Sequence, residues 1–268
     1  MNERYSLHQI TSAETCPFDA DGYSYFKFGD KQFAKKFASE LFDGFIAKYA
    51  AMMLDHNDIV ILPSPYLSIP TASNFLCFYF KEYLNNWLFQ NNKKTVIESK
   101  IYRNQTYVTD YGDLDFDERV KLISNDTYYI DRNFINNKLC IFVDDIKITG
   151  SHEHTVKKIL EQHDVQGQFI FVYFAELMNK EIHPRIENFY NYHAIKNIDD
   201  IIKIINSAAF EFNTRIVKYI LSFDDNEFQI LLKNTTSQQI SKLFQLAISN
   251  NYHQIENYQN NIQKIKSF

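Results

Sequence analysis

The sequence predicts an α/β fold, in which a parallel sheet is flanked by helices and followed by an all-helical C-terminal appendage. Short apolar runs of strand length alternate with segments of helical period, as in right-handed βαβ crossovers. The strand-like runs are apolar at consecutive positions, as expected for strands buried on both faces. Only helical patterns follow residue 196. We therefore divide the chain into an α/β domain, residues 1–196, and a helical C-terminal appendage, residues 197–268.

The first part of the chain predicts a helix, a strand and a second helix. Asp30 can cap a helix that runs to about residue 54, because apolar side chains recur there at every fourth position. The run 59–62 is short and β-branched, which predicts a buried strand. Pro70 suits the first turn of a further helix, whose period continues to residue 90.

The middle of the chain has weaker patterns. Residues 95–98 predict a second strand. Residues 100–113 are polar and aromatic without a clear period, so we expect a long loop or a hairpin. Residues 115–123 are compatible with a short helix.

The strongest strand pattern comes next, at residues 139–143. Helical spacing follows at 152–163, and 169–174 predicts another buried strand. In the appendage, a capping box at 236–239 predicts the start of a helix.

Composition and charge exclude several classes of protein. The 268 residues carry a formal net charge of -5, whereas nucleic-acid scaffolds have a basic surplus. No apolar run reaches the roughly 20 residues that span a bilayer, and the polar start of the chain does not resemble a secretory signal. Three cysteines without metal-type spacing fit free thiols in a reducing compartment. We expect a cytoplasmic protein that binds neither nucleic acid nor a membrane.

Two adjacent carboxylates, Asp144 and Asp145, follow the apolar run 139–143 and precede a Thr-Gly-Ser turn and a helix. In open parallel sheets, ligands bind beyond the carboxyl ends of the strands, and a strand-to-helix turn directs backbone N–H groups at an anion. The acids would repel a phosphate that touched them, so a sugar between acids and phosphate fits better. The competing interpretation is a helix cap and turn in an ordinary α/β protein.

The segment 142–151 resembles the 5-phosphoribosyl-1-pyrophosphate (PRPP) signature of type I phosphoribosyltransferases. The resemblance implies that the two acids contact the ribose 2- and 3-hydroxyls, and that residues 147–151 wrap the 5-phosphate. The donor-binding residues implied are Asp144, Asp145, Ile146, Lys147, Ile148, Thr149, Gly150 and Ser151. Ile148 stands where the family often has a second threonine, which removes one hydroxyl contact.

Three flanking segments extend the resemblance to the ComF-like branch found in bacteria. Residues 61–66 resemble the first strand and the pyrophosphate loop, with Ser64, Pro65 and Tyr66 in the loop. Lys100 and Arg103 resemble residues of the flexible catalytic loop, although both are also compatible with plain surface charges. Residues 117–123 resemble the stretch that precedes the signature strand.

One departure from the family concerns the pyrophosphate loop, which often contains a basic residue. No Lys or Arg lies between Asp58 and Lys81. The pyrophosphate charge would then be met by backbone N–H groups, by Mg²⁺, and by Lys100 or Arg103. Magnesium would be held through PRPP, with Asp144 and Asp145 as its candidate protein contacts.

The resemblance implies transfer of ribose 5-phosphate from PRPP to a nitrogen-base acceptor, with release of pyrophosphate. Its catalytic residues would be Asp144, Asp145, Lys100 and Arg103. One alternative is a non-catalytic regulatory protein that binds PRPP or a nucleotide, and another is a different phosphate-ester enzyme on a similar sheet. The acceptor is not encoded in any motif.

Some features have no assigned role at this stage. His152 and His154 are two residues apart and lie on different faces of a helix, so they do not predict a metal site. Tyrosines 102, 107 and 111 are candidates for stacking on a base. The appendage is expected to pack on the sheet domain or on a second subunit, and a homodimer is compatible with either.

Overall fold

A computed structural model describes residues 2–103 and 128–267. Its centre is a five-stranded, wholly parallel sheet of order β1-β7-β6-β2-β3, which confirms the predicted fold class. The strands are β1 (Asn2–Ile10), β2 (Ile59–Pro63), β3 (Ile97–Glu98), β6 (Lys138–Lys147) and β7 (Gly167–Leu177). A separate antiparallel pair joins β4 (Tyr102–Arg103) to β5 (Tyr128–Tyr129).

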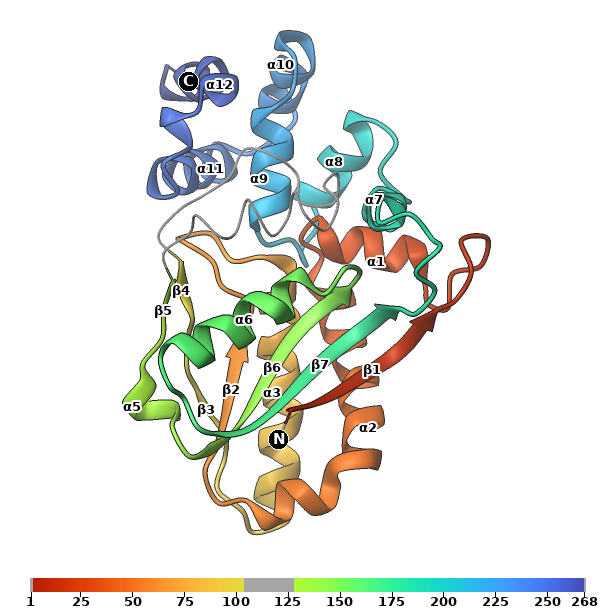
Figure 1. The fold of residues 1–268 in the computed structure, drawn as a ribbon. Helices are drawn as coiled ribbons and strands as arrows, with labels where there is room; N and C mark the ends of the chain where they lie inside the picture. Colours follow the sequence, from red (N-terminus) through yellow and green to blue (C-terminus); the bar gives the residue numbers. More distant parts are fainter. Residues whose placement is uncertain (1, 104–127, 268) are drawn as a thin grey trace.

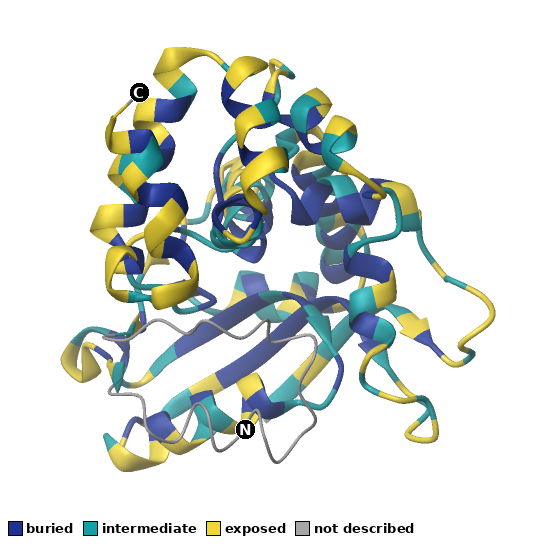
Figure 2. Cartoon of the chain, turned by 90° about the horizontal axis from the view of Figure 1, so that it is seen from above, coloured by how far each residue is buried: buried dark blue, intermediate teal, exposed yellow. Residues whose placement is uncertain are grey.

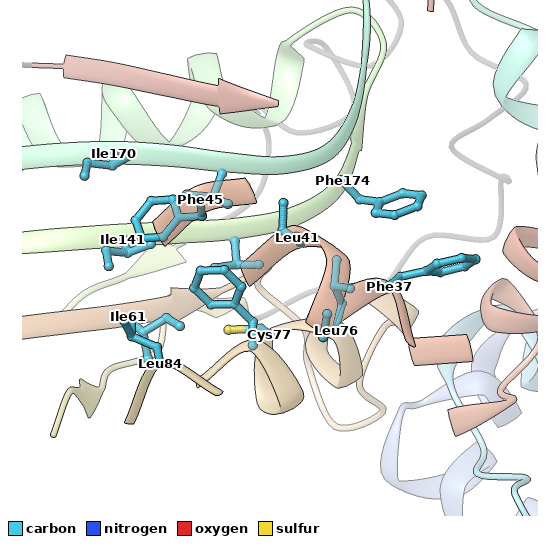
Figure 3. Packing of buried hydrophobic residues seen from close by; sticks show 14 of the residues in the cluster. Phe37, Leu41, Phe45, Ile61, Leu76, Cys77, Leu84, Ile141, Ile170 and Phe174 are labelled. Atoms are coloured by element: carbon cyan, nitrogen blue, oxygen red, sulfur yellow. The ribbon is translucent and has the colours of Figure 1, made fainter. Parts of the chain in front are cut away.

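Helices cover both faces of the sheet (Figure 1). α2 (Lys31–Asp55) and α3 (Ala72–Gln90) pack on one face, and α6 (Ser151–Gln162) packs on the other. Successive strand residues point to opposite faces. Ile141 of β6 therefore joins the core under α2 and α3, which Figure 3 shows together with Ile61 and Phe174, whereas Phe142 joins the core under α6.

The chain after β7 is helical. Its helices are α7 (Ile186–Asn191), α8 (Ile198–Ile205), α9 (Thr214–Leu221), α10 (Asp225–Lys233), α11 (Ser237–Ser249) and α12 (Glu256–Lys266). They lie beyond the carboxyl ends of the strands (Figure 1). In Figure 2, which views the molecule from above, the strands of the sheet are largely buried and the helices show exposed residues mainly on their outer sides. Among the described residues, no helix is both long and apolar enough to cross a membrane.

Hydrogen bonds tie the appendage to the α/β part of the same chain. The Thr214 hydroxyl donates to the Ile69 carbonyl at 2.8 Å, and the Asn250 side chain accepts from the backbone N–H of Ser68 at 3.0 Å. Phe28 and Ile69 belong to the hydrophobic core of the appendage. Of the two packing modes expected for these helices, the structure shows packing on the α/β domain of the same chain.

Several element predictions are confirmed. Asp30 is the N-cap of α2, and its carboxylate accepts from the Gln32 N–H at 2.8 Å. α6 agrees with the predicted helix 152–163 to within one residue at each end, and Thr236 forms the predicted capping box with Gln239 at the start of α11.

Other predictions were wrong or incomplete. The second strand has only two residues, Ile97–Glu98, at the sheet edge. Pro70 precedes the N-cap Thr71 and is therefore outside the first turn of α3. The start of the chain forms β1, which was not predicted because an edge strand with polar residues at alternate positions has no apolar run.

The predicted loop or hairpin at residues 100–113 is tested only in part. Tyr102 and Arg103 pair with Tyr129 and Tyr128, so its beginning is one arm of an antiparallel pair. Residues 104–127 lie outside the described residues. They include the predicted helix 115–123, the family-like stretch 117–123, and tyrosines 107 and 111.

Candidate functional site

A cavity of about 400 Å³ lies between the carboxyl end of β6 and the C-terminal helices α9 and α12. It is lined by the end of β6, the following bend, the start of α6, the segment after β2, and parts of α9 and α12. The predicted site residues on its wall are Ser64, Pro65, Arg103, Asp144, Asp145, Ile146, Lys147, Ile148, Thr149, Gly150 and Ser151. The fold thus brings the segment that resembles the PRPP signature, and part of the segment that resembles the pyrophosphate loop, to the same cavity.

The two acids lie inside β6, which continues to Lys147 and does not end at Val143 as predicted. Because strand residues alternate in direction, Asp144 and Asp145 turn to opposite faces. Asp144 reaches His152 of α6, and Asp145 reaches α1 (Ala20–Lys27) on the other side. The acids are neighbours in sequence with different surroundings.

Asp144 is the more accessible acid, with 15% of its side chain exposed against 7% for Asp145. Its Oδ2 lies 3.1 Å from Nδ1 of His152, and its Oδ1 accepts from the backbone N–H of Asp145 at 2.9 Å. Burial alone would raise the pKa of Asp144, but hydrogen bonds and charge from His152, with bonds from Asp145 and Ser64, hold it well below its usual range. Asp144 is therefore a carboxylate at neutral pH.

Asp145 is buried against two side chains of α1. Its Oδ2 accepts from the Tyr23 hydroxyl at 2.8 Å and forms an ion pair with the ammonium of Lys27. Burial and the charge of Asp144 raise the pKa of Asp145, against the opposing charge of Lys27. Burial also raises the pKa of Tyr23 well above its usual range, so its hydroxyl remains a donor. Through its ion pair with Asp145, Lys27 compensates one of the two negative charges of the neighbouring Asp144 and Asp145.

The bend after β6 combines a left-handed glycine, two hydroxyl side chains and the start of a helix. Gly150 has φ +79°, in the left-handed region, and is the residue before the first turn of α6. The hydroxyls of Thr149 and Ser151 lie 3.1 Å apart. A helix N-terminus presents N–H groups and a positive dipole end, which favours a phosphate at this bend.

Ion pairs anchor the bend and α6 to the sheet. The Arg4 guanidinium binds both carboxylate oxygens of Glu153, at 2.8 and 2.7 Å. The Lys147 ammonium, which the sequence placed around the 5-phosphate, donates to Glu176 at 2.7 Å. Ser6 donates to the same carboxylate at 2.5 Å. Because Glu153 and Glu176 are both nearly buried, these contacts fix the direction of the Lys147 side chain and the position of the start of α6.

Two of the predicted site residues, Tyr66 and Lys100, are not among those that line the cavity. The Lys100 ammonium lies 3.5 Å from the centroid of the Tyr66 ring and 5.4 Å from that of Tyr102. Burial lowers the pKa of Lys100, partly offset by Glu98. The structure therefore groups Lys100 with aromatic side chains beside the cavity and separates it from Arg103, which is on the wall.

Three basic residues on the wall were missed in the sequence. Lys27 comes from α1, and Arg215 and Lys218 come from α9. No motif surrounds Lys27, and only the helical spacing of the other two, three positions apart, indicated that they share a face. Their distance along the chain from the signature hid their relation to it.

No metal cluster is evident in the part of the chain that the structure describes: no group of three or more His, Cys, Asp or Glu side chains is arranged to hold an ion. His152 contacts Asp144, and Glu153 forms an ion pair with Arg4.

Comparisons with known proteins place the chain in a family. Two crystal structures of a hypoxanthine phosphoribosyltransferase from Staphylococcus aureus, in orthorhombic and tetragonal space groups, are similar to it at 9% identity. Each covers 56% of this chain, and the match spans 76% and 75% of theirs, with TM-scores of 0.30 and 0.28. No curated protein matches the chain. The assignment rests on a family model described as PRTase ComF-like, which matches residues 1–265. The chain belongs to the ComF-like phosphoribosyltransferase family.

Proposed function

We propose that this protein transfers ribose 5-phosphate between PRPP and a nitrogen-base acceptor, with release of pyrophosphate. The observation that carries the proposal is that one cavity wall holds both the partly exposed carboxyl group of Asp144 and the bend at the left-handed Gly150, where α6 begins. A sugar beside the acid would place its 5-phosphate at the bend, which is the order of groups in PRPP.

The two acids take different roles in this proposal. Asp144 accepts hydrogen bonds from the ribose hydroxyls, because it is the more exposed of the two. Asp145 contributes from a buried position, where its pair with Lys27 limits the negative charge that faces an anionic donor. The N–H groups at the start of α6 hold the 5-phosphate, and Thr149 and Ser151 add hydroxyl donors.

The residues present are compatible with magnesium held mainly through the donor. Mg²⁺ prefers hard oxygen ligands and often binds one or two carboxylates together with substrate phosphates. Asp144 provides such an oxygen, whereas the Lys27 ammonium competes for Asp145. When bound, Mg²⁺ would neutralise charge on the pyrophosphate. Asp144 would then serve both the metal and the ribose hydroxyls.

In the transfer itself, a ring nitrogen of the acceptor forms a bond to C1 of the ribose as the bond from C1 to pyrophosphate breaks. The bonding electrons leave with pyrophosphate, and the pyrophosphate takes up the proton that the acceptor nitrogen loses. Positioning is the main contribution of the protein, because fixed reactants avoid most of the entropic cost of meeting. Aromatic wall residues such as Tyr128, Tyr192 and Tyr219 offer faces for a flat base.

A thermal-shift screen with Mg²⁺ and PRPP tests the donor site. A ligand at about 100 times its dissociation constant stabilises the fold by roughly 2.7 kcal/mol. Asp144→Asn should lose the shift and remain folded, while Asp225→Asn, which changes an exposed acid of α10, should keep it. An unchanged PRPP shift in Asp144→Asn would contradict the assigned site.

A second candidate function is a regulatory protein that binds PRPP without transferring it. It is favoured by the absence of a basic residue between Asp58 and Lys81 and by the position of Lys100 beside the cavity. Labelled PRPP and a panel of bases separate the two functions. Release of pyrophosphate that depends on a base supports transfer, and PRPP binding without release supports regulation.

A further inference from the structure

The segment after β2 lines the cavity without contributing a charge. Ser64, Pro65 and Thr71 are on the wall, yet no Lys or Arg occurs between Asp58 and Lys81. Pyrophosphate carries several negative charges, which charge-assisted hydrogen bonds stabilise better than neutral ones. If the donor sits as proposed above, its pyrophosphate needs cations from another part of the chain.

α9 is fixed directly to this uncharged segment. The backbone N–H of Thr214 donates to the Pro70 carbonyl at 2.8 Å, and its hydroxyl donates to the Ile69 carbonyl, also at 2.8 Å. The buried Asn213 side chain donates to the carbonyl of Lys27 at 3.1 Å. The start of α9 is thus bonded both to the segment after β2 and to the helix that holds Asp145.

Two cations follow within the first turns of α9. Arg215 and Lys218 are three residues apart, so they share one face of the helix, and both line the cavity. An Arg215 Nη donates to the Tyr192 hydroxyl at 3.3 Å, which orients the guanidinium. Its charge also opposes the rise in the pKa of Tyr23 that burial causes. Arg215 and Lys218 therefore bring positive charge from α9 to the cavity wall.

We propose that Arg215 and Lys218 bind the pyrophosphate of the donor, an inference that rests on the proposed function. The guanidinium offers several N–H groups in a plane that matches phosphate oxygens, and Lys218 adds a point charge. The C-terminal helices then complete the donor site. They supply the positive charge that the loop after β2 lacks in this sequence.

Calorimetric titrations with three probes test the proposal: inorganic pyrophosphate, ribose 5-phosphate and PRPP, each with Mg²⁺. In Arg215→Gln/Lys218→Gln, affinity for pyrophosphate and for PRPP should fall roughly tenfold for each lost cation. Affinity for ribose 5-phosphate should stay close to that of the wild type, since its site is at the Gly150 bend. Lys203→Gln/Lys233→Gln removes the same charge from exposed positions of α8 and α10 and should change none of the three.

The outcomes separate the two proposals. If the wild type binds PRPP, and the α9 double variant binds PRPP and pyrophosphate as tightly as the wild type does, the α9 subsite is wrong and the proposed function stands. If the wild type binds none of the probes, the proposed function fails, and the subsite fails with it. Should the double variant not fold, Lys218→Gln and the charge-preserving Arg215→Lys carry the test. Lys218→Gln should weaken pyrophosphate binding, and Arg215→Lys should retain more of it than Arg215→Gln.

Discussion

The ammonium of Lys27 forms an ion pair with Oδ2 of Asp145, although 118 residues separate them in the chain. Both side chains are nearly buried, at 10% and 7% exposure. The pair joins α1 to the strand that carries the signature and leaves Asp144 as the more accessible of the two acids. The ion pair therefore affects both the stability of the fold and the charge of the proposed binding site.

Removal of the cation should be costly. Lys27→Met leaves Asp145 buried with Tyr23 as its remaining described partner, and loss of one member of a buried pair typically destabilises a protein by about 3–5 kcal/mol. Urea unfolding at pH 7 measures the change. Lys36→Met, which breaks an exposed pair with Asp19, should cost at most about 1 kcal/mol. Equal effects of the two substitutions would show that the Lys27 pair is not buried in solution.

The Glu153 ion pairs predict a specific pH dependence of stability. Burial alone would raise the pKa of Glu153, but Arg4 and Lys157 lower it from 4.5 to about 2. A lowered acid pKa stabilises the fold above the unfolded value, and this stabilisation is lost as pH falls from about 4.5 to about 2. We expect Glu153→Gln to be less stable than wild type at pH 7 by roughly 2–3 kcal/mol, after allowance for the half-exposed Arg4.

The measurement for Glu153 is urea unfolding of both proteins between pH 2 and 7. The difference between wild type and Glu153→Gln should shrink toward low pH. Glu161→Gln, at an exposed position of the same helix, serves as control and should follow the wild type throughout. If the difference in stability between wild type and Glu153→Gln does not change with pH, the effect of the substitution comes from packing and not from the charge of Glu153.

Two of the glycines with positive φ, Gly150 and Gly167, should separate binding from stability. Gly150→Ala places a side chain at φ +79°, which costs roughly 1–2 kcal/mol, and distorts the bend that would hold the 5-phosphate. Gly167→Ala, at the start of β7, forces a Cβ to 2.5 Å from the Lys138 carbonyl oxygen and should destabilise the fold at least as much. Thermal melts and ribose 5-phosphate titrations check both. Only Gly150→Ala should weaken binding beyond its effect on stability.

The cysteines should differ in reactivity. Burial raises the pKa of Cys140 to about 12 and raises that of Cys77 as well, whereas Cys16 is only half-buried. Because the thiolate is the nucleophile, iodoacetamide at pH 8 should label Cys16 first and the other two only after unfolding. Peptide mass spectrometry over time, with denatured protein as reference, measures this order. Rapid labelling of Cys140 in the native protein would mean that the core under α6 opens easily.

The sequence alone determined those parts of the protein that depend on local patterns. Consecutive apolar residues marked β2, β6 and β7, and helical periods with capping residues marked α2, α6 and α11. The order of acids, Thr-Gly-Ser turn and helix located the centre of the candidate site, because a strand, a bend and a helix start are formed by neighbouring residues. The edge strand β1 was not predicted, since it contains no run of consecutive apolar residues and its stability comes from pairing with β7.

Only the tertiary structure decided which distant charges face that centre. The continuation of β6 to Lys147 sends Asp144 and Asp145 to opposite faces, and packing then gives them His152 and Lys27 as separate partners. Folding of the C-terminal helices over the strand ends brings Arg215 to the same cavity. Contacts of this kind depend on how helices pack onto a sheet, and no periodicity within one segment encodes the partner that another segment will provide.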